Sequence, residues 1–383
     1  MKKDILFYII TLFYSVSLVL FSVYSYSQID LNLTLWGNPV YQSFQNHMIY
    51  LGYFNRPLSF WIFISLVVCF FACYIFFLKL ALGKKISEGK VLFLILFSSG
   101  LLFFSYPAFS SDIFNYMFDA RIVTKYHLNP YEYKPLDFSS DLWLRFMRWT
   151  HRTYPYGPLW LILTVPLSLL GMEKFVLTLL LFKFSFFLLH LSNTFLIYKI
   201  VKGMKKDLAF FSSLFYALNP LILIESVTSP HNDSIMLTLL LLSFYFINKK
   251  KNIISLAFLF LSGAVKFSTW ILAPLFIFKL FRKNLVYISA LALIIPLIVQ
   301  IVNREPYPWY FVPLLGIISL FTNYFYLQVA AIVFSFMEVF QYAPYLLLGV
   351  YTTEVAEIKT YIFYISLYII FICVFLYKIK TRR

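Results

Sequence analysis

Residues 5–26 read ILFYIITLFYSVSLVLFSVYSY, and residues 58–78 read LSFWIFISLVVCFFACYIFFL. Each stretch is long enough to cross the hydrocarbon core of a bilayer as a helix, which takes about 20 apolar residues. The rest of the chain has the same character, because 61% of its 383 residues are hydrophobic and only 13% are charged. A soluble domain carries about twice that share of charged residues. The composition therefore predicts an all-α polytopic membrane protein.

Hydropathy predicts about twelve transmembrane helices. They cover residues 5–26, 58–79, 91–108, 174–199, 208–228, 233–248, 252–266, 268–281, 285–302, 309–322, 324–338 and 359–378. Residues 252–281 also fit one kinked hairpin. The apolar stretch 157–171 is short, and it suits a re-entrant or interfacial helix better than a span. The first span follows a short basic segment, but it is too long for a signal peptide, and we expect it to be retained.

The distribution of charge predicts the orientation of the chain, whose net charge is +16. With a cytoplasmic N-terminus, most basic residues fall in inner segments, whereas among the acidic residues only Asp4, Glu88 and Asp207 do so. The inner basic residues are Lys2, Lys3, Lys79, Lys84, Lys85, Lys90, Lys199, Lys202, Lys205, Lys206, Lys249, Lys250, Lys251, Lys279, Arg282, Lys283, Lys378, Lys380, Arg382 and Arg383. Counting 157–171 as a full span would reverse this pattern. We therefore expect a plasma-membrane protein with both termini cytoplasmic, and no nucleic-acid partner.

One outer segment, residues 109–156, is far longer than the others and is rich in Tyr, Trp, Arg, Asp and Pro. Loops of this length are usually functional or disordered, and the aromatic residues argue against disorder. No internal repeat divides the chain. We expect a single transmembrane domain over residues 1–383, with a large extracytoplasmic catalytic loop at 109–156.

The start of this loop is expected to be helical, because Ser110 to Arg121 contains no helix breaker. At about 100° per residue, Asp112, Asn115, Tyr116 and Asp119 share one face. This face has two interpretations: an acidic site at the membrane surface, or a solvated interfacial helix with Asp112 near its N-terminus. Arg121 points to the opposite side, where it pairs within the loop or reaches a lipid phosphate.

A second polar cluster, His231, Asn232 and Asp233, follows Pro230 in the turn between two expected spans. His and Asn can donate hydrogen bonds to a phosphate or a sugar hydroxyl, and Asp can accept one. The alternative is that Pro230 ends one helix and Asn232 or Asp233 caps the next, which explains Asp233 well and His231 poorly.

Two cationic residues are further candidates for a binding site. Lys266 lies in a largely apolar run, where an ionisable side chain suggests function, although snorkelling to the outer interface is the alternative. Arg304 stands in an outer loop whose aromatic residues suggest an interface belt first, but it could also bind a phosphate. Lys183 has few polar neighbours, so we expect it to have no functional role. No nucleotide-binding, zinc-protease or nucleophile-elbow motif is present.

Taken in order, these segments resemble the GT-C superfamily of membrane glycosyltransferases, in particular the polyprenol-phosphate-mannose-dependent mannosyltransferases. The family pattern S-D-D-x-Y-x-Y-x-x-D-G-R corresponds to residues 110–121 here, and N-P-Y to residues 129–131. The pattern Y-x-Y-G-P-L corresponds to residues 154–159, and N-P followed by G-H-N-D to residues 219–220 and 230–233. The later lysine of the family has a loose counterpart in Lys266. The resemblance covers roughly residues 105–280.

The chain departs from this pattern at three positions. The paired acid is Ser111-Asp112, which leaves one acid at that point, Ala120 replaces the glycine before Arg121, and Pro230 replaces the glycine before His231. The single acid makes a metal less expected, and the sequence alone leaves a divalent metal open; otherwise no cofactor is implied.

The resemblance implies transfer of a sugar, mannose by family, from a polyprenyl-phosphate donor to an envelope glycan or glycolipid acceptor outside the cytoplasm. It implies an inverting displacement with one general base, for which we expect Asp112, while Asp119 positions the acceptor or a metal-bridged phosphate. His231, Lys266 and Arg304 are candidates for the phosphate. The other candidates for substrate binding are Tyr116, Arg121, Tyr156, Asn232 and Asp233. The main alternative is a transporter or flippase of lipid-linked glycans, which would carry polar residues at the membrane midplane.

Overall fold

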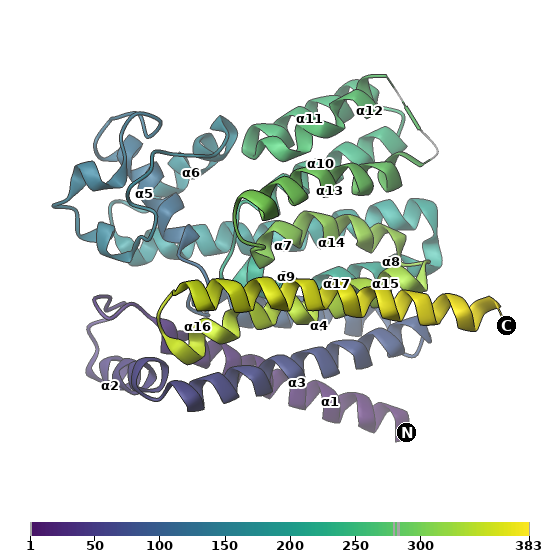
Figure 1. Cartoon of the computed structure of the whole chain (residues 1–383), viewed down its shortest axis with the longest axis horizontal. Coiled ribbons are helices and arrows are strands. Elements are labelled where there is room, and N and C mark those ends of the chain that lie inside the picture. The colour runs from purple at the N-terminus through teal and green to yellow at the C-terminus, as the bar shows by residue number, and fades with distance from the viewer. Residues whose placement is uncertain (1, 279, 282–283, 383) are drawn as a thin grey trace.

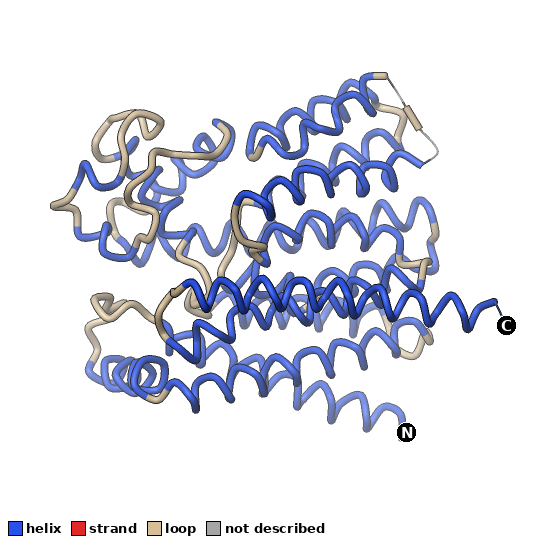
Figure 2. The backbone as a smooth tube through the Cα atoms, viewed as in Figure 1, coloured by secondary structure: helices blue, strands red, loops and turns tan. Residues whose placement is uncertain are grey.

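The computed structural model describes residues 2–278, 280–281 and 284–382, and within them the chain forms helices and connecting loops without strands (Figure 2). The α-helices are α1 (Lys2–Ser25), α2 (Pro39–Ile49), α3 (Arg56–Leu82), α4 (Glu88–Phe103), α5 (Asp112–Thr124), α6 (Pro158–Leu170), α7 (Phe175–Met204), α8 (Ala209–Ala217), α9 (Pro220–Leu223), α10 (Asp233–Asn248), α11 (Asn252–Val265), α12 (Ala273–Ile277), α13 (Leu285–Asn303), α14 (Val312–Ile318), α15 (Phe325–Val339), α16 (Ala343–Leu348) and α17 (Thr353–Arg382). The short 3₁₀ and π segments are η1 (Tyr26–Gln28), η2 (Tyr50–Phe54), η3 (Pro135–Phe138), η4 (Leu142–Phe146), η5 (Lys206–Leu208), η6 (Ile224–Thr228), η7 (Phe267–Leu272), η9 (Pro308–Phe311), η10 (Ser319–Phe321) and η11 (Phe340–Tyr342). The all-helical prediction is confirmed for these residues.

Six helical segments of the described chain are long and apolar enough to cross a membrane. They are Ile5–Gln28, Arg56–Leu82, Phe175–Met204, Leu285–Asn303, Phe325–Leu348 and Thr353–Leu376. A seventh results if Lys206–Ala217 and Pro220–Thr228, which meet at an angle of 56°, form one broken span. The predicted count of about twelve spans is therefore not confirmed, although a multi-pass membrane protein agrees with these helices.

The difference in span count lies where the apolar segments are short. The expected spans at 233–248, 252–266, 268–281 and 309–322 fall on apolar helices of 10–17 residues. The stretch 157–171, expected to be a re-entrant or interfacial helix, also forms a short helix, α6. Hydropathy detects such segments, but their length alone does not carry them across a bilayer about 30 Å thick.

The long helices lie side by side as a bundle, with both chain termini at one end and α2, α5 and α6 at the other (Figure 1). The connections α3–α4, α7–α8 and α10–α11 lie at the end of the termini, and an ion pair of 3.4 Å joins Lys84 to Asp207 there. These are the connections that carry the lysine clusters. Of the basic residues predicted to lie inside, Lys279, Arg282, Lys283 and Arg383 are outside the described residues.

The bundle and the loop region have separate apolar cores. The larger core joins α1, α3, α4, α8, α10, α14 and α15, with fully buried rings such as Phe21, Phe63 and Phe77. The smaller core lies under α5 and α6, where Ile113, Phe118 and Trp160 pack with Phe182 of α7. The segment 109–156 is thus a packed lobe and not a disordered loop.

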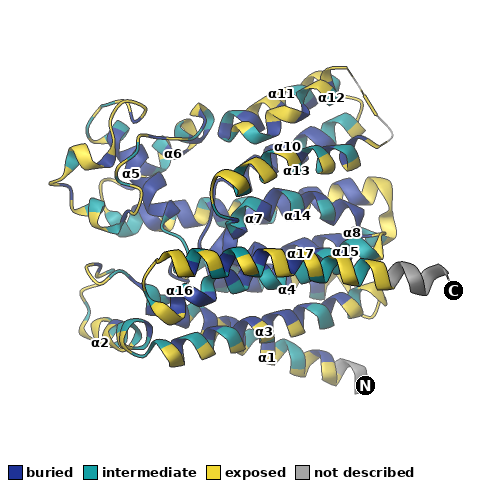
Figure 3. Cartoon of the chain, viewed as in Figure 1, coloured by how far each residue is buried: buried dark blue, intermediate teal, exposed yellow. Residues whose placement is uncertain are grey.

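Exposed positions lie along the helices of the bundle (Figure 3), and many of them carry large apolar side chains. On α13, for example, Ile298 and Val302 are 53% and 77% exposed, and α17 exposes Tyr368 and Phe371 to a similar degree. A surface of this kind is stable against lipid tails and would associate in water.

Candidate active site

A cavity of about 980 Å³ opens at the end of the bundle that carries α5 and α6. Two walls enclose it, which we name by their position in the chain. The N-terminal wall comprises Asp112, Trp149, His151, Arg152, Pro155, Tyr156, Asn232, Lys266, Phe267, Ser268 and Ile271. The C-terminal wall comprises Ile295, Pro296, Val299, Gln300, Asn303, Arg304, Glu305, Tyr307, Trp309 and Tyr310. Two carboxylates, those of Asp112 and Glu305, therefore share one space with several cations and many aromatic rings.

Helix α5 delivers Asp112 to this cavity from its first turn. The Ser110 hydroxyl accepts a hydrogen bond from the Asp112 N–H at 3.2 Å, which ties the start of the helix to the preceding loop. Every residue from Asp112 to Ile122 is buried. The interpretation of α5 as a solvated interfacial helix is therefore wrong, because loop residues 138–156 and helices α6 and α7 pack around it. Only Asp112 of its polar face lines the cavity.

His231 lies behind Asp112, between the carboxylates of Asp112 and Glu225. Its Nε2 is 3.9 Å from the Asp112 Oδ2 and 3.0 Å from the Ser110 Oγ, while its Nδ1 is 3.2 Å from the Glu225 Oε2. Burial opposes a charged imidazole, but the contact with Glu225 and the charges of Asp112 and Asp233 outweigh it and raise the pKa of His231. A cationic imidazole here would lie 3.9 Å from the carboxylate of Asp112, as a positive charge directly behind the proposed site.

The segment that carries His231 is shaped by a break in the helix after α8. Asn219 caps α9 by accepting a hydrogen bond from the Leu221 N–H at 3.0 Å, and Pro220 occupies the first helical position. A π-helical turn follows, and the Tyr342 hydroxyl donates to the Glu225 Oε1 at 2.6 Å. Asn219 is thus a capping residue.

Asn232 does not have the capping role that helix termination would give it. Its side chain forms no capping hydrogen bond at the start of α10, and its buried Nδ2 has no partner among the described residues. Its backbone N–H donates to the Tyr116 hydroxyl at 3.3 Å, which joins α10 to α5. Asn232 lines the cavity as a residue, with its unpartnered amide nitrogen buried behind the cavity surface.

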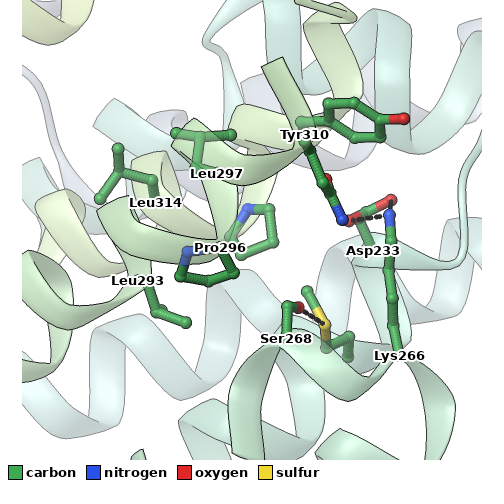
Figure 4. A pocket seen from close by; sticks show the side chains of 11 residues that line it. Asp233, Lys266, Ser268, Leu293, Pro296, Leu297, Tyr310 and Leu314 are labelled. Atoms are coloured by element: carbon green, nitrogen blue, oxygen red, sulfur yellow. Dashed lines mark hydrogen bonds and ion pairs between the residues drawn. The ribbon is translucent and has the colours of Figure 1, made fainter. Parts of the chain in front are cut away.

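Lys266 pairs with Asp233 across the gap between α11 and α10. Its Nζ is 2.9 Å and 3.0 Å from the two oxygens of Asp233, and it lies 4.9 Å from the centre of the Tyr310 ring. Figure 4 shows these two side chains facing each other below Tyr310, with Leu293, Leu297 and Leu314 on the far side of a small adjoining cavity. Because Lys266 also lines the large cavity, one of its N–H groups can reach a ligand there.

Gly157 brings Lys266 next to Tyr156. The Gly157 N–H donates to the Val265 carbonyl at 3.0 Å, and a Cβ added at Gly157 would lie 2.1 Å from the Ala264 carbonyl oxygen. The Tyr154 hydroxyl donates to the Gly157 carbonyl at 3.1 Å. The Tyr-Gly-Pro segment therefore needs glycine because two backbones meet there.

Arg121 and Asp119 lie away from the cavity. The Arg121 Nε donates to Asp141 at 2.7 Å, and the guanidinium lies 4.1 Å from the Trp143 ring, so Arg121 pairs within the loop, one of its two predicted alternatives. Asp119 is 5% exposed, and burial raises its pKa to about 7 against the lowering charge of Arg152, with Asp112 raising it further. Asp119 therefore lies on the buried side of α5, close enough to Arg152 of the cavity wall for their charges to interact.

Of the predicted site residues, the structure brings Asp112, Tyr156, Asn232, Lys266 and Arg304 together on the cavity surface. Asp233 lines the adjoining small cavity, and Tyr116 and His231 lie just behind the surface. Arg121 and Asp119 do not reach it. In the described part of the chain, no group of three or more His, Cys, Asp or Glu side chains is arranged to hold a metal ion.

The sequence did not reveal several residues of the cavity. His151, Arg152 and Trp149 belong to the long loop but to none of its motifs, although their position just before Tyr156 was a usable signal. Trp309 was assigned to an interface belt, whereas its ring stacks on His231 with centroids 4.2 Å apart. No local pattern in the sequence indicates that contact, because the two residues are far apart in the chain.

A protein-family model described as "Alpha-(1->6)-mannopyranosyltransferase, N-terminal domain" matches residues 18–282, which is more than half of the chain. No curated protein and no solved structure matches the chain. The matched region includes the whole N-terminal wall of the cavity and stops before the C-terminal wall begins.

Proposed function

The chain belongs to the alpha-(1->6)-mannopyranosyltransferase family and is a glycosyltransferase, and we propose that it transfers mannose from a polyprenyl-phosphate donor to an envelope glycan or glycolipid. In this proposal the reaction takes place in the cavity at the α5 end of the bundle, on the outer face of the plasma membrane. The lysine-rich connections at the opposite end support this orientation, because such residues favour the cytoplasmic side.

The observation that carries the proposal is that the cavity combines a carboxylate, several cations and an exposed apolar wall. Asp112 lies on one side, and Arg152, Lys266 and Arg304 surround the same space. Cations of this kind stabilise a phosphate leaving group, and Arg can bind it through two hydrogen bonds. A sugar phosphate and a nucleophilic hydroxyl are the reactants that this arrangement suits best.

The apolar part of the cavity supports a lipid-linked donor. Ile295 and Val299 on α13 are 55% and 53% exposed, and Phe267 of η7 is 53% exposed, yet all three also line the cavity. These exposed side chains give the cavity an apolar lining. An isoprenoid chain can bury its methyl groups against them while the phosphate lies between the cations.

The proposed reaction is a single displacement at the anomeric carbon. The acceptor oxygen attacks this carbon, the bond to the phosphate oxygen breaks, and polyprenyl phosphate leaves with the bonding electrons. Asp112 accepts the proton of the acceptor hydroxyl, and Lys266 and Arg304 balance the charge that develops on the phosphate. Attack from the side opposite the leaving group inverts the anomeric configuration.

The test is sugar transfer in proteoliposomes from labelled polyprenyl-phosphate-mannose to a mixture of cell-envelope acceptors. Asp112→Asn keeps the shape of the side chain but removes the base, and we expect transfer to fall by about 10²–10⁴-fold. Asp137→Asn in the same loop is the matched control, because Asp137 is exposed and lies outside the cavity lining.

Folding of each variant is checked by thermal unfolding in detergent. Full activity of Asp112→Asn would refute the base assignment. A folded wild-type protein that transfers no sugar from any polyprenyl-phosphate donor would refute the donor class.

A further inference from the structure

Four side chains form a continuous stack that ends at His231. The indole of Trp309 lies nearly parallel to the His231 ring, with centroids 4.2 Å apart and an angle of 10°. On Trp309 lies the Tyr307 ring, at 4.5 Å and 8°. The Lys359 Nζ lies 4.7 Å from the centre of the Tyr307 ring and pairs with Glu305 at 2.7 Å. The stack therefore runs from the last long helix, α17, to the residue behind Asp112.

The edges of the His231 ring are held separately from its face. Ser110 and Asp112 contact the Nε2 edge, and Glu225 contacts the Nδ1 edge. The Asp112 and Glu225 contacts are ion-pair distances without hydrogen-bond geometry, so together with the Ser110 hydrogen bond they hold the two ring nitrogens but leave the tilt of the ring free. Trp309 covers the ring face and thereby supplies the missing restraint.

The indole also suits the charge of its neighbour. An aromatic face attracts a cation, and Trp attracts it most strongly among the aromatic side chains. Glu225 from η6, Asp112 from α5 and Asp233 from the start of α10 already favour a protonated His231. The Lys359 cation is on the far side of two rings and is matched by Glu305. Trp309 thus adds to a site that already favours the imidazolium.

We propose that Trp309 is a positioning residue, which holds the imidazole of His231 edge-on to Asp112 and so orients the carboxylate. The inference rests on the proposed base role of Asp112. His231 does not line the cavity, and it acts on the reaction only through Asp112. Because Trp309 follows the region that the family model matches, this function belongs to the C-terminal part of the chain.

The kinetic test compares Trp309→Phe, which keeps an aromatic face, with Trp309→Ala and Trp309→Leu, which remove it. Trp61→Ala is the control, because Trp61 is 63% exposed on α3 and belongs neither to the stack nor to the cavity lining. We expect kcat to fall about tenfold in the Ala and Leu variants, with little change in KM for the donor, and Trp309→Phe to restore most of the rate. A rise in KM with unchanged kcat would instead identify Trp309 as a substrate contact and overturn the proposal.

The second readout does not depend on transfer. The chain has only five histidines, so ring-labelled histidine gives a simple NMR spectrum, in which His231→Gln identifies the signal of His231. Without the indole we expect the titration midpoint of His231 to fall by about 0.5, and with Trp309→Phe to stay close to wild type. If Trp309→Ala fails to fold, Trp309→Leu replaces it in the test, because leucine fills more of the space left by the indole with an apolar side chain.

The two readouts separate this proposal from the proposed function. If the protein transfers no sugar from the chosen donor but the His231 midpoint still responds to Trp309, the donor assignment fails and the positioning contact stands. If transfer is normal and the midpoint is the same in wild type and the Ala and Leu variants, the positioning role is refuted while the enzyme class stands.

Discussion

The two walls of the cavity differ in how their side chains are held. In the N-terminal wall, Lys266 pairs with Asp233, and Gly157 bonds to the backbone of Val265. These groups come from segments that resemble family motifs, and buried contacts hold each one. In the C-terminal wall, Arg304 is exposed, and the rings are anchored through one stack and one ion pair to α17.

This difference suggests a division of labour. A rigid wall can fix the reacting groups within the small tolerance that catalysis requires. A wall held by fewer contacts can adapt to different ligands, and it is the wall that carries the exposed apolar residues of α13. We therefore expect substitutions in the N-terminal wall to reduce transfer more strongly than substitutions in the C-terminal wall.

After Asp112→Asn, the largest effect is expected for Gly157→Ala. The new Cβ would overlap the Ala264 carbonyl, a backbone atom that cannot rotate away, so the segments of Tyr156 and Lys266 must separate. We expect a loss of transfer of about 10²-fold and a destabilisation of about 1–3 kcal/mol, measured by proteoliposome assay and thermal unfolding. Gly203→Ala is the matched control, because no atom lies within 4 Å of its added Cβ. Equal behaviour of the two variants would show that the close approach is unimportant.

Lys266→Met tests whether the rigid wall serves chemistry or only folding. The change leaves the carboxylate of Asp233, which is 2% exposed, without its cation, and it should destabilise the protein by about 3 kcal/mol. Adding Asp233→Asn removes the unpaired charge and should restore much of the stability. Transfer should stay at least about tenfold below wild type in the double variant, because the phosphate still lacks its cation. Recovery of activity together with stability would assign Lys266 a structural role alone.

The sequence predicted the fold class and the N-terminal wall better than the rest. Helical periodicity placed Asp112 and Asp119 on one face, and the order of the motifs located Tyr156, Asn232 and Lys266. Periodicity could not reveal that α5 is enclosed, because enclosure depends on the packing of the long loop around it. It also could not predict that Asp112, and not Asp119, reaches the cavity.

The C-terminal wall was only partly predictable for a physical reason. Aromatic residues after Arg304 fit a membrane interface as well as a cavity, and only a tertiary contact separates the two. The stacking of Trp309 on His231 is such a contact. The number of spans was uncertain for a related reason, since short apolar helices such as α11 satisfy hydropathy but not length.

The pH dependence of stability tests whether helix α5, which carries Asp112 to the N-terminal wall, is sealed from water at Asp119. Burial raises its pKa to about 7 in the folded protein, whereas the unfolded chain has the ordinary value of 3.8. Its contribution to stability is therefore complete below about pH 3.8, and it is lost as the pH rises through about 7. Asp119→Asn mimics the neutral acid. Its stability relative to wild type should therefore increase between about pH 4 and about pH 7, which are the two pKa values, and then level off.

Asp141→Asn is the control for Asp119→Asn, because the pKa of Asp141 is shifted in the opposite direction. Burial of Asp141 is outweighed by hydrogen bonds from Tyr126 and Arg121, so the pKa of Asp141 is lowered. Its stabilising effect is present at neutral pH and is lost as the pH falls through that lowered pKa. Thermal unfolding in detergent, from above the raised pKa of Asp119 to below the lowered pKa of Asp141, measures both variants. Parallel curves for Asp119→Asn and wild type would mean that water reaches Asp119.

The smallest effect is expected where the C-terminal wall is anchored. Lys359→Met removes the cation over Tyr307 and leaves Glu305 without its ion pair, but the rings can still stack. We expect transfer to fall by about twofold to fivefold, less than for Trp309→Ala, because the indole remains on His231. Tyr307→Phe keeps the ring and should change the rate by less than about twofold. If Lys359→Met were as damaging as Lys266→Met in the same proteoliposome assay, the C-terminal wall would be as rigidly required as the N-terminal one, and the proposed division between them would be wrong.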